Sequence, residues 1–245
     1  LLSVVDAPAI KALKVVADTG NGMVGPALRD VYSRLPVSLV GLYLDPDGSL
    51  PNHGLDPLQP ENRAELQKRV VSEGAAIGFA FDGDGDRMLA VDSGGREFDG
   101  DEIVALAALH LADAGELRGG GAAVTVMSNY GFHQAMEAAG IPVATTQVGD
   151  RWVIEELLQR GWTIGGEQSG HIIWTDFAAT GDGLAAALLT MRALGERHLA
   201  DVKPIEKLPQ RLENVRIPSQ EALNEATGVW EAVGREGAKL EGRGR

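Results

Sequence analysis

Residues 81–87 read Phe-Asp-Gly-Asp-Gly-Asp-Arg, and the loop 82–87 lies between two short apolar segments, 76–81 and 88–91. On extended backbone, aspartates at alternate positions project to the same side of the chain. Three converging carboxylates repel one another unless a cation lies between them. The intervening glycines allow the backbone to turn tightly around that ion. The stretch therefore predicts a cation-binding loop between two strands, with the ligands Asp82, Asp84 and Asp86.

The chemistry of this loop favours Mg²⁺. Carboxylate oxygens are the ligands of hard cations, and Mg²⁺ characteristically keeps positions open for a substrate phosphate. Arg87 follows the third aspartate directly and could place its guanidinium against the same phosphate. A solvated acidic turn between two strands remains the alternative interpretation of the stretch.

An EF-hand is the obvious competing interpretation, and the sequence excludes it. If Asp82 were position 1 of such a loop, the required glycine at position 6 would be Arg87. The required glutamate at position 12 would be Ser93. The segments on either side also have the character of strands, whereas helices flank an EF-hand loop.

Strand-like and helix-like segments alternate on both sides of the loop, which predicts a layered α/β fold with mixed sheets. Polar turns that contain glycine separate them, and a second cycle of the same kind begins near Gly100. We expect strands over 13–17, 37–44, 76–81, 88–91, 122–127, 143–148 and 162–164. We expect helices over 24–35, 61–73, 101–111, 132–139 and 150–159.

The two cycles resemble each other, which indicates an internal duplication and two similar α/β domains in tandem. The predicted first domain spans 1–98 and contains the acidic loop, and the second spans 99–203. Residues 204–245 change in character, with one expected strand over 212–217 and one helix over 221–236. Because these elements are too few to close a core, we expect them to be the start of a truncated α+β domain.

Two further loops could bind ligands. Glu167, Ser169 and His171 alternate after a predicted strand, so they can face one cleft and suit the hydroxyl groups of a sugar. A polar loop with no ligand is the alternative interpretation. Residues 20–25 fit the glycine fingerprint of a dinucleotide-binding turn, which would make the protein an oxidoreductase that binds NAD. Asp18 would then stand unneutralised beside a pyrophosphate, so a tight strand–helix turn is the favoured interpretation.

Composition excludes several classes of protein. The net charge is −13 and the pI about 4.8, which argues against a nucleic-acid partner. There is no cysteine, so disulfides and thiolate catalysis are excluded. No run of apolar residues is long enough to span a membrane, and the first residues lack the features of a signal peptide. We expect a cytoplasmic protein without a membrane partner.

The sequence resembles the α-D-phosphohexomutase superfamily over residues 1 to about 216. Residues 81–87 are similar to its metal loop and residues 166–171 to its sugar-specificity loop, in the same order and at a similar separation. The resemblance implies that Asp82, Asp84 and Asp86 hold Mg²⁺, that Arg87 orients the transferred phosphoryl group, and that Glu167, Ser169 and His171 bind a hexose phosphate. It also implies a phosphoserine donor and a bisphosphate intermediate.

The substrate implied by the resemblance differs between the two halves of the chain. Residues 148–151, 166–172 and 180–183 resemble phosphoglucosamine mutases, which interconvert glucosamine 6-phosphate and glucosamine 1-phosphate. Residues 47–53 resemble phosphomannomutase/phosphoglucomutase instead. Because the sugar-specificity loop would contact the hexose, we favour glucosamine phosphate and keep mannose or glucose phosphate as the alternative.

The 245 residues contain no Ser-His-Asn segment of the kind that carries the family's phosphoserine, nor its C-terminal phosphate loop. We therefore expect the chain to be part of a longer enzyme and to be inactive alone. A sugar-phosphate-binding fragment without catalysis is the second alternative. The resemblance is compatible with a homodimer, but no residue pattern decides the oligomeric state.

Overall fold

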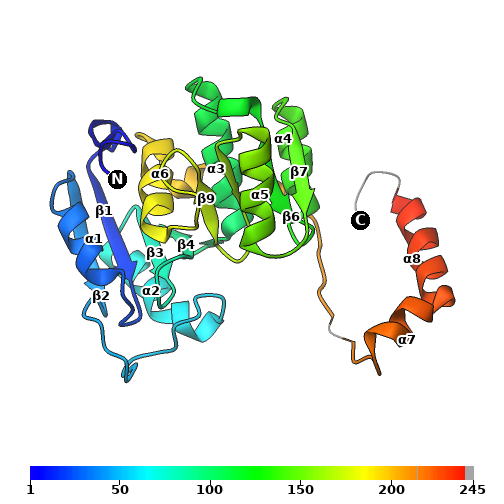
Figure 1. Ribbon diagram of the computed structural model, residues 1–245. Coiled ribbons are helices and arrows are strands. Elements are labelled where there is room, and N and C mark those ends of the chain that lie inside the picture. The colour runs from blue at the N-terminus through cyan, green and yellow to red at the C-terminus, as the bar shows by residue number, and fades with distance from the viewer. Residues whose placement is uncertain (214, 241–245) are drawn as a thin grey trace.

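The computed structural model describes residues 1–213 and 215–240, and it contains two mixed β-sheets that lie side by side (Figure 1). The first sheet has the order β2-β1-β3-β4-β5. Its strands are β1 (Leu13–Asp18), β2 (Val37–Leu42), β3 (Ile77–Phe81), β4 (Met88–Asp92) and β5 (Glu97–Phe98). The helices of this part are α1 (Gly25–Tyr32) and α2 (Pro60–Glu73), after a 3₁₀ turn over Ala7–Ala9.

The second sheet has the order β7-β6-β8-β9. Its strands are β6 (Ala122–Thr125), β7 (Val143–Thr146), β8 (Ile164–Gly166) and β9 (Ile172–Trp174). The helices of this part are α3 (Gly100–Asp113), α4 (Tyr130–Ala138), α5 (Asp150–Arg160) and α6 (Gly183–Leu194). Short 3₁₀ turns lie over Arg118–Gly120 and Leu199–Asp201.

The two sheets repeat one topology, which confirms the predicted duplication. In the first, β1 pairs in parallel with β2 and β3, and β3 pairs antiparallel with β4. In the second, β6 pairs in parallel with β7 and β8, and β8 pairs antiparallel with β9. The acidic loop joins β3 to β4, and residues 167–171 join β8 to β9. The two loops predicted to bind ligands therefore occupy equivalent positions in the two repeats.

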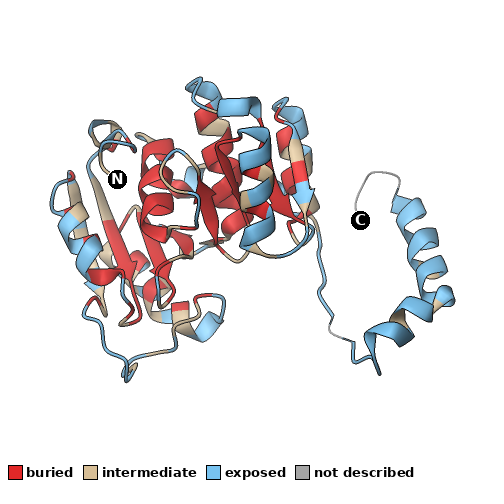
Figure 2. Cartoon of the chain, viewed as in Figure 1, coloured by how far each residue is buried: buried red, intermediate tan, exposed pale blue. Residues whose placement is uncertain are grey.

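One large hydrophobic core joins the repeats. Buried side chains of both sheets and of the helices between them form this core, among them Phe79, Met88, Ile164 and Leu188. Helices α3 and α6 are buried and contact each other, and each also contacts strands of both sheets (Figure 2). Smaller clusters lie under α2 and α5 on the outer faces. Because the core is shared, the relative positions of the two loops are fixed by packing.

Helix α6 and strand β9 are absent from the sequence-based expectations. Every residue of α6 is buried, so its apolar side chains surround the helix and show no 3.6-residue period. Strand β9 has only the three residues Ile172–Trp174, too few to show alternation. Strands β2, β6 and β7 end two residues before the predicted limits, and β8 begins two residues after its predicted start.

The part after residue 203 differs from the prediction. Of the expected strand over 212–217, residue 214 lies outside the described residues and the others form no strand. The expected helix is two helices, α7 (Gln220–Glu225) and α8 (Thr227–Leu240), with Ala226 between them at a non-helical ψ of 68°. Both lie apart from the sheets and are exposed (Figures 1 and 2). Within 204–213 and 215–240 the expected α+β domain is thus represented by helices alone.

Candidate functional site

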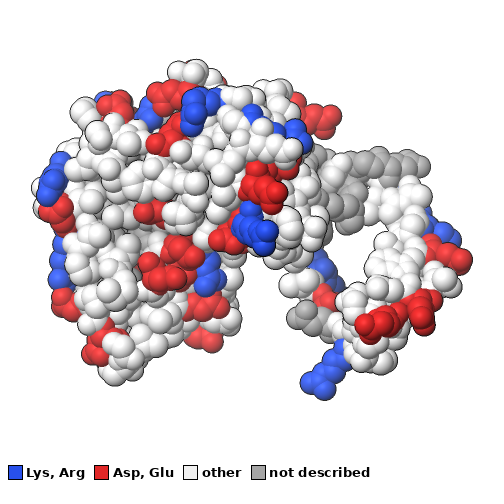
Figure 3. Space-filling model, viewed as in Figure 1, with Lys and Arg blue, Asp and Glu red and all other residues white. Residues whose placement is uncertain are grey.

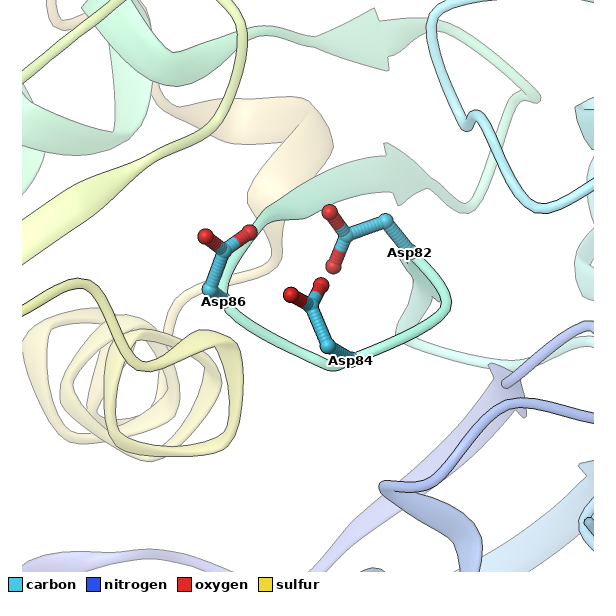
Figure 4. A group of neighbouring side chains, drawn as sticks. All are labelled: Asp82, Asp84 and Asp86. Atoms are coloured by element: carbon cyan, nitrogen blue, oxygen red, sulfur yellow. The ribbon is translucent and has the colours of Figure 1, made fainter. Parts of the chain in front are cut away.

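The three aspartates of the β3–β4 loop converge as the sequence predicts. Figure 4 shows the carboxylates of Asp82, Asp84 and Asp86 pointing toward one another across the loop. One oxygen from each lies within 4.8 Å of the others. Asp82 is buried, Asp86 half-buried and Asp84 exposed, so the cluster is open to solvent on one side. A hard divalent cation matches this donor set, and the open side leaves room for further oxygen ligands.

Asp82 also builds the loop. Its Oδ1 accepts hydrogen bonds from the backbone N–H groups of Gly85, at 3.1 Å, and Arg87, at 3.0 Å. Its Oδ2 accepts one from Arg87 Nε at 2.7 Å. Gly85 has φ +80°, a backbone conformation that other residues rarely adopt. Arg87 therefore lies against the acidic cluster, where its guanidinium also faces Asp86 at 3.6 Å and Asp56 at 3.8 Å.

The electrostatics of the loop favour a bound cation. Burial, and then the adjacent carboxylate of Asp82, raise the pKa of Asp86 to about 6. A carboxyl group with this pKa has lost much of the solvation that stabilises its charged form. A divalent cation among the three side chains would replace that solvation, so the residues present fit a metal ion.

The loop of the second repeat lies directly against the acidic loop. Arg87 and His171 form an isolated antiparallel bridge, and the N–H of Met88 donates to the carbonyl of Gly170 at 2.9 Å. His171 is buried, and its Nδ1 lies 3.3 Å from Asp86 Oδ2. The structure thus brings together the predicted metal ligands and the predicted sugar ligand His171.

The other two predicted sugar ligands lie on the same loop and are half-buried. Glu167 Oε1 accepts a hydrogen bond from the N–H of Gly149 at 2.9 Å, which ties this loop to the start of α5. Ser169 lies between Glu167 and His171 in the turn. The backbone carbonyl of Gln168 accepts a hydrogen bond from the N–H of Gly100 at 3.1 Å. This contact with the first turn of helix α3 holds the loop over residues 167–171 in position.

A partly buried ion pair beside the acidic loop escaped the sequence analysis. Asp18 ends β1 and is 2% exposed, and its two oxygens lie 3.1 and 3.2 Å from His53 Nε2. His53 Nδ1 lies 2.7 Å from the carbonyl of Gly54, so both ring nitrogens face acceptors, as in an imidazolium. The hydrogen bond with Asp18 raises the pKa of His53. The spacing of 35 residues gave no local signal for this pair.

The glycine turn over residues 20–25 follows β1 and precedes α1, as a tight strand–helix turn requires. It packs on the acidic loop, because the N–H of Met23 donates to the carbonyl of Gly83 at 2.8 Å. A Cβ on Gly22 would lie 2.7 Å from the same carbonyl oxygen. The turn therefore supports the acidic loop through close backbone contact.

We expect the pair of His53 and Asp18 to stabilise the fold more at low than at high pH. Because the pKa of folded His53 is raised above 6.5, its contribution is complete below pH 6.5 and is lost as the pH rises through the folded value. His53→Gln should lower the free energy of unfolding by on the order of 1 kcal/mol at pH 6, and by less at pH 8.5. Urea unfolding at both values, with exposed His198→Gln as the control, measures this. An equal loss at both pH values would contradict the ion pair.

Comparisons with known families assign both repeats of the chain. Residues 2–95 match the description "Phosphoglucomutase/phosphomannomutase, alpha/beta/alpha domain II", and residues 99–213 match domain III of the same family. The chain belongs to the phosphoglucomutase/phosphomannomutase family. The acidic loop lies in the part that matches domain II, and residues 167–171 lie in the part that matches domain III.

Curated relatives within this family include the phosphoglucosamine mutases of Desulforudis audaxviator and Pelotomaculum thermopropionicum. Each is 44% identical over 96% of this chain, which covers 52% and 53% of their respective lengths. The chain therefore spans about half the length of the curated relatives it matches. The same partial coverage holds for related solved structures.

A phosphoglucomutase/phosphomannomutase family protein of Burkholderia thailandensis superposes with a TM-score of 0.72 at 31% identity, over 79% of this chain and 43% of that one. The Aspergillus fumigatus N-acetylphosphoglucosamine mutase was solved in complex with GlcNAc-6P and magnesium. It superposes with a TM-score of 0.68 at 20% identity, over 90% of this chain and 51% of that one. Both share the fold of the two family domains described above.

Charged side chains are distributed over the face of the molecule that Figure 3 shows. On the face in Figure 3, acidic and basic side chains of the described residues are interspersed and form no broad basic patch. Within residues 1–213 and 215–240, every helix is too short or too polar to cross a bilayer.

Proposed function

We propose that this chain forms the metal-binding and sugar-binding part of a phosphohexomutase that interconverts glucosamine 6-phosphate and glucosamine 1-phosphate. One observation carries the proposal: the acidic loop and the loop over 167–171 occupy equivalent positions in the two repeats and meet at the bridge of Arg87 and His171. This contact supports assigning the proposed metal ligands and the proposed sugar ligands to one site. The 44% identity to phosphoglucosamine mutases supports the choice of sugar.

In this proposal Asp82, Asp84 and Asp86 hold Mg²⁺, which when bound neutralises the charge of a phosphoryl group. Arg87 lies beside the cluster, where its guanidinium can hold the oxygens of that group in a fixed orientation. The carboxylate of Glu167 accepts hydrogen bonds from sugar hydroxyls, and the hydroxyl of Ser169 donates to them or accepts from them. His171 orients Asp86 through Nδ1 and closes the site between the two loops.

Mannose or glucose phosphate is the second candidate substrate, because residues 47–53 resemble phosphomannomutase/phosphoglucomutase. In the structure His53, from that segment, contacts Asp18, while Glu167 and His171 belong to the other loop. This placement supports giving residues 166–172 more weight than residues 47–53 in the choice of substrate. A role in binding without catalysis is the other alternative, since the sequence contains no Ser-His-Asn segment to donate a phosphoryl group.

Titration calorimetry of the purified chain tests the proposal. We expect glucosamine 6-phosphate to bind in the presence of Mg²⁺ more tightly than inorganic phosphate, and more tightly than mannose 6-phosphate or glucose 6-phosphate. Glu167→Gln should weaken binding by roughly tenfold, the effect of losing a hydrogen bond to a charged group. Inorganic phosphate that binds as tightly as every sugar phosphate would refute the sugar site. Mutase turnover by the 245 residues alone would refute the expectation of inactivity.

A further inference from the structure

Residues 180–183 read Thr-Gly-Asp-Gly and have no role in the preceding proposal. They lead into helix α6, whose first residue is Gly183. Gly181 is buried, and its backbone lies against the side chain of His171. A Cβ added to Gly181 would lie within 2.8 Å of three atoms of the imidazole ring, Nε2, Cε1 and Cδ2. The lack of a side chain at residue 181 therefore makes room for this ring.

The backbone of Gly181 is held on both sides. Gly181 and Ile173 form an isolated antiparallel bridge at β9. Two residues further on, the N–H of Gly183 donates to the carbonyl of Gly85 in the acidic loop at 2.8 Å. Helix α6, which begins there, is buried along its whole length. A methyl group at residue 181 would therefore meet the ring, because the backbone that carries it has little freedom to retreat.

The backbone of His171 is held as well. It forms the bridge to Arg87, and its carbonyl accepts a hydrogen bond from the N–H of Glu167 at 3.0 Å. Its ring is buried, and Nδ1 lies 3.3 Å from Oδ2 of Asp86. Rotation about the side-chain bonds is the movement that remains available to the ring. Such a rotation would take Nδ1 away from Asp86.

We propose that Gly181 is a positioning residue of the site, because the space it leaves holds the imidazole of His171 against Asp86. The ring in turn keeps Asp86 in place for the metal ion. Groups that contact a metal ligand from outside the coordination shell orient it, and their loss weakens metal binding. This inference rests on the proposed function, since Asp86 is one of the three proposed ligands. Residues 180–183 thereby form a third segment of the site.

The first test is Mg²⁺ binding by the purified chain. Gly181→Ala should weaken it by roughly tenfold in calorimetric titration. The chain should remain folded, because the added methyl group meets the end of a side chain that can rotate. Urea unfolding without Mg²⁺ checks this, and Gly48→Ala is the control, since no atom lies within 4 Å of the Cβ it would add. An affinity in Gly181→Ala equal to or higher than that of the unchanged chain would overturn the proposal.

A double variant shows whether the effect passes through His171. His171→Ala removes the ring and should itself weaken Mg²⁺ binding by roughly tenfold. In that background Gly181→Ala should cause less than about a twofold further loss, because its methyl group no longer meets a ring. Substitutions that act independently would instead multiply to a loss of roughly 100-fold. That result would overturn the positioning role.

A crystal structure of Gly181→Ala grown without Mg²⁺ gives a readout that does not depend on the metal. We expect the imidazole to be rotated, with Nδ1 more than about 4 Å from the carboxylate of Asp86. A ring that stays at 3.3 Å would overturn the proposal. If the unchanged chain binds no Mg²⁺, the proposed function fails and this inference with it. If the unchanged chain binds Mg²⁺ and Gly181→Ala binds it equally well, this inference alone fails.

Discussion

Asp84→Asn should abolish tight Mg²⁺ binding and leave the chain folded. Asp84 is exposed and makes no hydrogen bond or ion pair with the described residues, so its carboxylate serves no structural purpose in the loop. Its removal takes one of three charged ligands from the cluster, which should weaken Mg²⁺ binding by at least roughly 100-fold. Repulsion with Asp82 and Asp86 also decreases, so the free energy of unfolding without Mg²⁺ should stay equal or rise slightly.

Calorimetric titration with Mg²⁺ measures the change in affinity. Urea unfolding in the absence of Mg²⁺ measures the change in the free energy of unfolding. Asp113→Asn, an exposed aspartate elsewhere, is the matched control and should change neither. Asp82→Asn provides a contrast, because Asp82 accepts three hydrogen bonds within the loop, and its loss should reduce stability as well as binding. Unchanged Mg²⁺ affinity in Asp84→Asn would show that the cluster is an acidic turn rather than a metal site.

Gly100→Ala should damage both the fold and the sugar site. A Cβ at this position would lie 1.9 Å from the carbonyl oxygen of Glu167 and 2.8 Å from the N–H nitrogen of Gly170. Neither side can yield easily, since α3 is buried between the sheets and the loop is held by its bridge to Arg87. We expect the free energy of unfolding to fall by about 2–4 kcal/mol.

The same substitution should displace Glu167 and His171 and so remove binding of glucosamine 6-phosphate. Gly48→Ala is the control, because no atom lies within 4 Å of the Cβ it would add. Urea unfolding and calorimetry of both variants measure the difference. A loss of less than about 0.5 kcal/mol in Gly100→Ala, the range of ordinary surface substitutions, would contradict the close packing of α3 on the loop.

The fold was predictable where each element is half-buried or bounded by glycine and polar residues. Strand β3 and helix α2 follow directly from their patterns, and the similarity of the two cycles correctly indicated two repeats. Helix α6 could not be found in this way, because a helix buried on every side has no polar face to give it a period. The short strand β9 depends on pairing with β8, which is information about tertiary structure.

The candidate site was predictable only where its chemistry is local in sequence. The alternation of Asp82, Asp84 and Asp86 within one loop predicts the acidic cluster. The alternation of polar residues over 167–171 likewise predicts the second candidate loop. That the two loops touch follows from the shared core and could not be derived from spacing. His53 pairs with Asp18, which lies 35 residues earlier in the sequence, and His171 lies 3.8 Å from Asp150, which lies 21 residues earlier. Only the packing of the sheets and their loops brings these residues together.

Crystals of the chain grown with Mn²⁺ and glucosamine 6-phosphate test most directly whether the two loops form one site. Mn²⁺ replaces Mg²⁺ at oxygen ligands and can be located by its anomalous scattering. We expect one strong peak among Asp82, Asp84 and Asp86, at roughly 2.0–2.2 Å from their oxygens, with the sugar against Glu167 and Ser169. A metal peak elsewhere, or a sugar bound away from residues 167–171, would contradict a shared site.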